Sequence, residues 1–225
     1  MGRPERSDSN FREAPGNVSP QVHDLLQIAG RSLPAVPSWV KSCLRANGYV
    51  ITRRFSNTED QIPIGICGKE RHQRFATSIP RRLVRRIVTP PELLRLVDRL
   101  SNKCFPALLS LKLLKQRWLD LKLPWGPIGS VSRELLIGDS IVSAHSDLDI
   151  VIRAEKRFTK DDAQSLAAST LDLPARVDIR VETPFCGFAL AEFGWRCPGE
   201  ILLRTPIGPI LGSDPWAEPR RCYPK

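Results

Sequence analysis

The stretch SDLDIVIRA, residues 146–154, decides the fold of this chain, because its apolar β-branched run predicts a buried strand that also carries aspartates. Alternate residues of a strand share a face, so Asp147 and Asp149 are predicted to point the same way, with Cα atoms about 7 Å apart. Two like charges held this close in a partly buried place repel each other by roughly a few kcal/mol. A compensating group is therefore expected nearby.

Two further segments offer partners for these carboxylates. Upstream, WGPIGS contains Gly129 and Ser130, and a Gly-Ser loop lets backbone N–H groups and a hydroxyl approach a phosphate. Downstream, RVDIRVE alternates so that Asp178 and Arg180 share one strand face while apolar residues face the core. Alone, a Gly-Ser pair is more often a turn, and a D-x-D pair is more often solvent-exposed. A third carboxylate on a later strand is what a two-cation phosphoryl-transfer site needs.

The order of patterns predicts an α/β or mixed α+β protein, because strands and helices alternate along the chain. Residues 1–18 are polar and predict a flexible tail, residues 19–88 a small Arg-rich α/β domain, and residues 89–225 a catalytic domain. Strands are expected at 49–55, 63–68, 74–79, 83–88, 175–183 and 201–205, and helices at 39–47, 92–103, 106–119, 160–172 and 185–197. Segment 22–29 fits either a short helix or a strand.

Composition excludes several classes of protein. No window of the 225 residues approaches 18 uninterrupted apolar residues, and the N-terminus has no apolar signal region, so a cytoplasmic, non-membrane protein is expected. The six cysteines form no C-x-x-C pair and the three histidines complete no zinc spacing, which predicts free thiols. The net charge of +10 favours polyanionic ligands or acidic partners.

The Gly-Ser loop, the D-x-D strand and the later h-D-h strand together resemble the nucleotidyltransferase superfamily. This resemblance implies a mixed sheet with flanking helices, preceded here by the small α/β domain. It also implies transfer of a nucleotidyl group from a triphosphate to a hydroxyl, with Mg²⁺ held by Asp147, Asp149 and Asp178. Positioning and cations supply most of the catalysis in such reactions.

Longer strings sharpen the resemblance. WGPIGSVSRELLIG, SDLDIVIRA, RVDIRVETPFCGFALAEF and LLRTPIGPILGSDPW look like the phosphoribosyl-dephospho-CoA transferases of the malonate decarboxylase system, also called malonate decarboxylase holo-acyl-carrier-protein synthases. PIGICGKERHQRFATSI is similar to the N-terminal domain of that family, whose G-x-x-R-x-Q-R core falls on Gly68, Arg71, Gln73 and Arg74. The match runs in order from about residue 20 to 216.

The resemblance implies a donor, an acceptor and roles for the residues. The donor would be 2'-(5''-triphosphoribosyl)-3'-dephospho-CoA, and the acceptor a serine of the acyl-carrier subunit of malonate decarboxylase, with pyrophosphate leaving. Asp147 and Asp149 would hold the metal and help activate the serine, and Asp178 would be a third ligand or the general base. The residues expected to contact the donor's phosphates are Gly129, Ser130, Arg71, Arg74, Arg180 and Arg204. His145 is expected to be an ordinary loop residue.

Two other functions compete with this interpretation. A different nucleotidyltransferase, acting on a small-molecule, RNA or protein hydroxyl, would share the carboxylates but would not need the GPILGSDPW tail or the Arg-rich N-terminal domain. A basic nucleic-acid-binding protein is disfavoured, because the chain has only two tyrosines and no cluster of aromatic and basic residues for stacking on bases.

Overall fold

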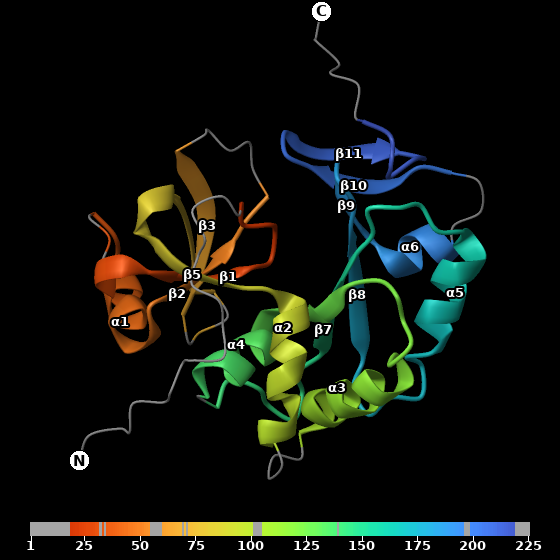
Figure 1. Ribbon diagram of the computed structural model, residues 1–225, viewed down its shortest axis with the longest axis horizontal. Coiled ribbons are helices and arrows are strands. Elements are labelled where there is room, and N and C mark those ends of the chain that lie inside the picture. Colours follow the sequence, from red (N-terminus) through yellow and green to blue (C-terminus); the bar gives the residue numbers. More distant parts are fainter. Residues whose placement is uncertain are drawn as a thin grey trace, which may run out of the picture. The chain divides into compact units, whose positions relative to one another are not determined.

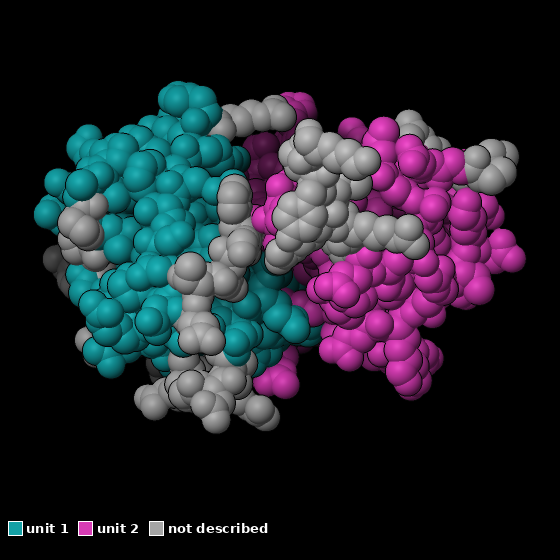
Figure 2. All heavy atoms as spheres, turned by 90° about the horizontal axis from the view of Figure 1, so that it is seen from above, with its two compact units in different colours: residues 1–53, 57–92 teal, residues 54–56, 93–225 magenta. Residues whose placement is uncertain are grey.

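The computed structural model describes residues 19–31, 33, 35–54, 60–68, 70, 72–100, 105–138, 140–195 and 199–218. The predicted tail at 1–18 lies outside these described residues. The chain divides into two compact units, one formed by residues 1–53 with 57–92 and the other by residues 54–56 with 93–225 (Figure 2). Each unit has its own sheet, so the two are taken in turn (Figure 1).

The first unit is built on an antiparallel sheet with strand order β4-β3-β2-β1-β5. Its strands are β1 (Leu25–Ile28), β2 (Tyr49–Thr52), β3 (Gln61–Cys67), β4 (Arg74–Pro80) and β5 (Val84–Val88). Its helices are α1 (Ser38–Asn47) and the 3₁₀ turns η1 (Ala29–Arg31) and η2 (Arg81–Leu83). The segment that fitted either helix or strand, 22–29, therefore supplies a strand.

Helix α1 and the sheet enclose the core of the first unit. Val40 and Leu44 of α1 are fully buried and belong to one apolar cluster with Leu26 and Ile64 of the sheet. The helix ends at Gly48, whose φ of 69° is left-handed and therefore suits glycine. The helical prediction for 39–47 is confirmed.

The second unit is built on a mixed sheet with strand order β11-β10-β9-β8-β7-β6. Its strands are β6 (Trp125–Pro127), β7 (Leu148–Arg153), β8 (Val177–Glu182), β9 (Gly187–Ala189), β10 (Ile201–Thr205) and β11 (Gly208–Gly212). Strands β7 and β8 run parallel, and the other described neighbours run antiparallel. With two sheets and interspersed helices, the predicted mixed α+β class is confirmed (Figure 1).

Helix α2 (Pro90–Leu93) spans the point in the chain where the first unit gives way to the second. The helices of the second unit are the 3₁₀ helix η3 (Leu94–Leu100), α3 (Pro106–Arg117), α4 (Gly129–Ile137), α5 (Lys160–Ala168) and α6 (Leu190–Trp195). Helix α5 begins as predicted, with Thr159 and Asp162 forming a reciprocal capping box. The single α-helix expected over 92–103 is instead a short α turn that continues as 3₁₀ helix to Leu100, and residues 101–103 lie outside the described residues. Within the described ranges, no helix combines the length and the apolar character needed to cross a membrane.

One predicted helix is partly wrong. The segment 185–197 has the composition of a helix, yet among its described residues the first part forms β9 and Leu190–Trp195 is helical, while residues 196–197 lie outside the described residues. Phe188 pairs with Val181 of β8, and Gly187 pairs with Arg204 of β10, so strand pairing at long range overrides local helix propensity. Strand β11, which no pattern indicated, forms a local hairpin with β10 as its antiparallel partner.

An aromatic cluster anchors the C-terminal part of the second unit. The ring of Trp216 lies 5.2 Å from that of Phe158 and 5.6 Å from those of Phe188 and Phe193. The indole N–H of Trp216 donates to the carbonyl of Ala154, 2.9 Å away, at the end of β7. The tryptophan of the GPILGSDPW string thus packs against the sheet and ties the chain's end to β7.

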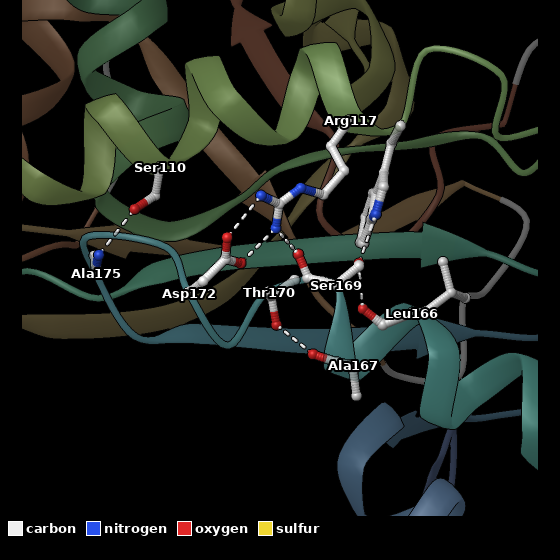
Figure 3. A network of polar contacts seen from close by, with 9 residues as sticks. Ser110, Arg117, Leu166, Ala167, Ser169, Thr170, Asp172 and Ala175 are labelled. Carbon is white, nitrogen blue, oxygen red and sulfur yellow. Dashed lines mark hydrogen bonds and ion pairs between the residues drawn. The ribbon is translucent and has the colours of Figure 1, made fainter.

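A polar network joins α3 to the segment that leads into β8 (Figure 3). The Arg117 guanidinium donates to both carboxylate oxygens of Asp172, at 2.6 and 2.9 Å, and to the carbonyl of Ser169. The Ser110 hydroxyl, fully buried in α3, accepts the N–H of Ala175 at 2.8 Å. These contacts fix residues 169–175, so the path of the chain into β8 is set by α3.

Candidate active site

Asp149 and Asp178 lie side by side on one face of the sheet. They are direct partners in the parallel pairing of β7 with β8, which places their Cα atoms about 4.8 Å apart. Their neighbours Ile150 and Ile179 are buried, while the two aspartates are half-buried. The predicted strands and their alternation are confirmed here, and the pairing brings two of the predicted site residues together.

Gly129 lies directly against the Asp149 carboxylate. A Cβ atom at position 129 would lie 2.4 Å from Oδ2 of Asp149, and the glycine has a left-handed φ of 64°. The N–H of Ile128 donates to the Asp149 carbonyl at 2.9 Å, which ties the Gly-Ser turn to β7. Both the close approach and the backbone conformation therefore require glycine.

Helix α4 begins at this glycine. Ile128 precedes its first turn and provides no side-chain cap for the first backbone N–H groups, and Ser130 follows, half-buried. The N-terminus of a helix attracts negative charge through these N–H groups. The described geometry thus places an uncapped helix start beside a carboxylate, as a Gly-Ser phosphate loop next to a metal ligand would need.

Asp147 is placed differently from the expectation. Regular strand begins only at Leu148, so Asp147 is an exposed residue immediately before β7. The preceding turn explains the late start, because the N–H of Ser143 donates to the Ser146 hydroxyl at 3.0 Å and the N–H of Ser146 returns to the Ser143 carbonyl. His145 lies exposed within this turn, as predicted for an ordinary loop residue.

Glu134 is a site-supporting residue that the sequence did not reveal. Its side chain in α4 is 1% exposed, and its Oε2 accepts the N–H groups of Ile141 and Val142 at 2.8 and 2.6 Å. One carboxylate therefore ties α4, which starts at Gly129, to the loop that leads to Asp147. The sequence does show a single acidic residue beside apolar ones in SRELLIG, which could have marked Glu134 as buried. Its hydrogen-bond partners, seven and eight residues later, follow from no regular spacing and could not be predicted.

Arg180 engages Asp178 on the face shared with Asp149. Its Nη2 lies 3.0 Å from Oδ2 of Asp178, with the two side chains 30% and 34% exposed. Arg204 lies close to both. Loss of solvent lowers the pKa of Arg204 below its ordinary value, the charge of Arg180 acts in the same direction, and Asp178 and Glu192 oppose it. Asp178 thus has one cation in direct contact, Arg180, and its charge also acts on a second, Arg204.

The last charged position of β8 has a different partner. Glu182 forms an ion pair with Arg54, a residue that groups with the second unit. Gly187 lies beneath the pair, and a Cβ there would come within 2.6 Å of both side chains. Burial lowers the pKa of Arg54 from its ordinary value. Glu182 is therefore held in an ion pair at the far end of the same strand face.

In the first unit, the predicted G-x-x-R-x-Q-R core forms the turn between β3 and β4. The N–H of Gly68 donates to the Gln73 carbonyl at 3.0 Å, and the Gln73 side-chain oxygen accepts the N–H of Glu70 at 3.2 Å. A Cβ on Gly68 would lie 2.1 Å from that oxygen. The Gly and Gln of the motif thus shape the turn. Arg74 is exposed at the start of β4, and Arg71 lies outside the described residues.

The carboxylates fit a divalent cation that shares its shell with a substrate. Among the described residues, no group of three or more His, Cys, Asp or Glu side chains is gathered closely enough to hold a metal. Asp149 and Asp178 nevertheless put hard oxygen ligands side by side, and Mg²⁺ is often bound through one or two carboxylates completed by phosphates and water. Mg²⁺ at Asp147, Asp149 and Asp178 stays a prediction.

Two family models and several relatives match the chain. The Phosphoribosyl-dephospho-CoA transferase MdcG C-terminal domain matches residues 94–215, and the corresponding MdcG N-terminal domain matches residues 21–90. The phosphoribosyl-dephospho-CoA transferase of Azotobacter vinelandii is 35% identical over 207 residues, covering 88% of this chain and 95% of the relative. That of Pseudomonas aeruginosa is 33% identical over 201 residues, with the same coverage.

A phosphoribosyl-dephospho-CoA transferase of Klebsiella pneumoniae is 34% identical over 204 residues, covering 88% of this chain and 97% of the relative. No solved structure matches the chain. The two family models cover both units, and the relatives align over almost their whole length at more than 30% identity. This chain therefore belongs to the phosphoribosyl-dephospho-CoA transferase family.

Proposed function

We propose that this protein transfers the phosphoribosyl-dephospho-CoA group from 2'-(5''-triphosphoribosyl)-3'-dephospho-CoA to a serine of the acyl-carrier subunit of malonate decarboxylase. The serine oxygen attacks the phosphorus nearest the ribose, and the bond from that phosphorus to the rest of the triphosphate breaks. Pyrophosphate leaves, the serine proton passes to a base, and a phosphodiester remains. The reaction is thus a nucleotidyl-type transfer.

The observation that carries this proposal is the pairing of Asp149 with Asp178 beside Gly129. Family membership supports the group that is transferred, and this geometry supports the chemistry. A polyphosphate lying at the start of α4 would accept hydrogen bonds from backbone N–H groups and from Ser130. Its charge would be shared by a divalent cation on Asp149, which supplies electrostatic stabilisation of the phosphoryl oxygens when bound.

The remaining roles follow from position. Arg180 and Arg204 lie on the sheet face that carries the carboxylates, so they are the arginines of the second unit best placed to contact the donor's phosphates. Asp147, exposed just before β7, is the proposed second metal ligand. Asp178 is proposed as a third ligand or as the base for the serine proton.

The decisive experiment is mass spectrometry of the apo carrier subunit incubated with this protein, the triphosphorylated donor and Mg²⁺. The proposal predicts the mass gain of one phosphoribosyl-dephospho-CoA group and one equivalent of pyrophosphate. A carrier whose acceptor serine is replaced by alanine is the matched control and should gain nothing. A native carrier that stays unmodified when donor and Mg²⁺ are raised to saturating concentrations would refute the proposal.

The surface charge supports the proposed partners. A protein of net charge +10 attracts both a polyphosphate donor and an acidic carrier, so the association rate with the carrier should fall steeply as salt is raised. Stopped-flow association at several ionic strengths measures this, and a rate that does not depend on salt would refute the steering. We also propose that the reaction occurs in the reducing cytoplasm, where thiols such as those of Cys43, Cys67 and Cys186, which the structure describes without a disulfide bond, persist.

A further inference from the structure

The ion pair of Arg180 with Asp178 sits where the proposed function needs both residues for other partners. The two side chains are neighbours two residues apart on β8, and Arg180 Nη2 lies 3.0 Å from Oδ2 of Asp178. In the proposed reaction, Asp178 faces a cation and Arg180 faces phosphate. Each residue therefore neutralises the charge that the other would offer to a cation or to a phosphate.

We propose that Arg180 and Asp178 exchange partners when the polyphosphate donor arrives, and that Arg180 keeps Asp178 from the cation until then. Arg180 turns from the carboxylate to the phosphate, and Asp178 becomes available to the cation that lies on Asp149. This inference rests on the proposed function and adds an order to it. Binding of the donor would thus release Asp178 and complete the metal site, whereas a cation that binds without the donor would lack Asp178 as a ligand.

The chemistry of the two groups favours such an exchange. A guanidinium presents a planar fork that matches two phosphate oxygens, whereas the contact with Asp178 involves a single nitrogen. Ion pairs exposed to this degree add little to stability, so breaking this one costs little. Both residues also stand on a paired strand, so a change of side-chain rotamer alone can redirect them while the sheet stays in place.

Binding of Mn²⁺ alone, followed by electron paramagnetic resonance, tests the first half of the exchange without any donor. Arg180→Met releases Asp178 and should tighten Mn²⁺ binding by about tenfold or more, as expected when a paired carboxylate loses its cation. Arg204→Met is the matched control, since it removes the same charge from the same face. Its effect should be several-fold smaller, because no hydrogen bond from Arg204 to Asp178 is seen among the described contacts.

A double variant distinguishes direct binding of Mn²⁺ by Asp178 from the effect of a change in net charge. Asp178→Asn combined with Arg180→Met has the native net charge, so it should bind Mn²⁺ within about twofold of the native protein, since neither offers Asp178 to the ion. A double variant that binds about tenfold more weakly would show that Asp178 already holds the ion without donor. That result, or equal tightening by Arg180→Met and Arg204→Met, would overturn the exchange.

Calorimetric titration with the Mg²⁺ complex of inorganic tripolyphosphate tests the second half. Arg180→Met should weaken this binding by about tenfold or more, opposite in sign to its effect on Mn²⁺ alone, because a charge-assisted contact to phosphate is lost. Unchanged or tighter binding would overturn the exchange. Circular dichroism should show that all variants keep the native spectrum. These readouts need no carrier, so a failure of group transfer would count against the proposed function alone.

Discussion

The two faces of the β7–β8 pair differ in character around Asp149 and Asp178, although consecutive residues of the same two strands form both faces. One face carries Ile150, Ile152 and Val181, all fully buried. The other carries Asp149 and Asp178, half-buried and paired across the strands. The apolar face supplies the burial that holds the strands together, and its rigidity keeps the two carboxylates close in spite of their repulsion. Substitutions at two adjacent residues, one on each face, should therefore affect the rate of transfer and the stability of the fold separately.

The largest effect is expected on the charged face. Asp149→Asn should lower the rate of group transfer at least about a thousandfold, equivalent to about 4 kcal/mol, because the proposed metal loses its central ligand. The urea midpoint should stay near that of the native protein, since the amide has nearly the same shape. Asp120→Asn, in the exposed turn after α3, is the control and should be fully active. Turnover of Asp149→Asn within tenfold of native would remove this residue from the active site.

The apolar face should respond in the opposite way. Ile150→Ala opens a cavity between the sheet and its cover and should lower the free energy of unfolding by about 2–5 kcal/mol. The transfer rate per folded molecule should remain close to native. Urea denaturation with a parallel rate assay measures both quantities. Ile207→Ala, at an exposed position, should cost less than about 0.5 kcal/mol, and an equal cost at both positions would contradict the assignment of the core.

Glu134 should affect both stability and the rate of transfer, because its side chain is buried and also holds the loop that precedes Asp147. Glu134→Gln replaces the charged oxygen that accepts both N–H groups, of Ile141 and Val142, with a neutral amide oxygen that accepts more weakly, so unfolding should become easier by about 1–3 kcal/mol. Transfer should also slow at temperatures where the variant is fully folded. Glu155→Gln is the exposed control. A variant as stable and as fast as native would show that the loop is held by other contacts.

The smallest effect is expected away from the strands, in the network of Figure 3. Ser110→Ala removes the acceptor of the Ala175 N–H, and a lost buried hydrogen bond should cost about 1–2 kcal/mol in unfolding free energy. Ser165→Ala, on the exposed side of α5, should cost nothing measurable. Thermal unfolding of both variants decides whether α3 holds the entry to β8; equal midpoints would show that it does not.

Much of the site could be predicted from local patterns. Period-two alternation placed Asp149 and Asp178 on strands, and glycine marked the turn at Gly129, because both signals depend on near neighbours in the chain. Strand β9 escaped prediction because Gly187 pairs with Arg204, a residue distant in sequence, and β11 escaped because it is the second strand of a short hairpin with β10 that no alternation announced. Local composition favoured a helix at 185–197, and pairing with β8 and β10 decided otherwise.

The sequence by itself determined which residues alternate, where glycine must interrupt the chain and which residue types could hold a phosphate and a cation. These properties follow from backbone sterics and from side-chain chemistry within a few residues. Only the tertiary structure decided that Asp149 faces Asp178, that Gly129 lies against the Asp149 carboxylate and that Arg180 pairs with Asp178. Strand register and buried contacts such as that of Glu134 set these distances, and they join residues that the sequence keeps apart.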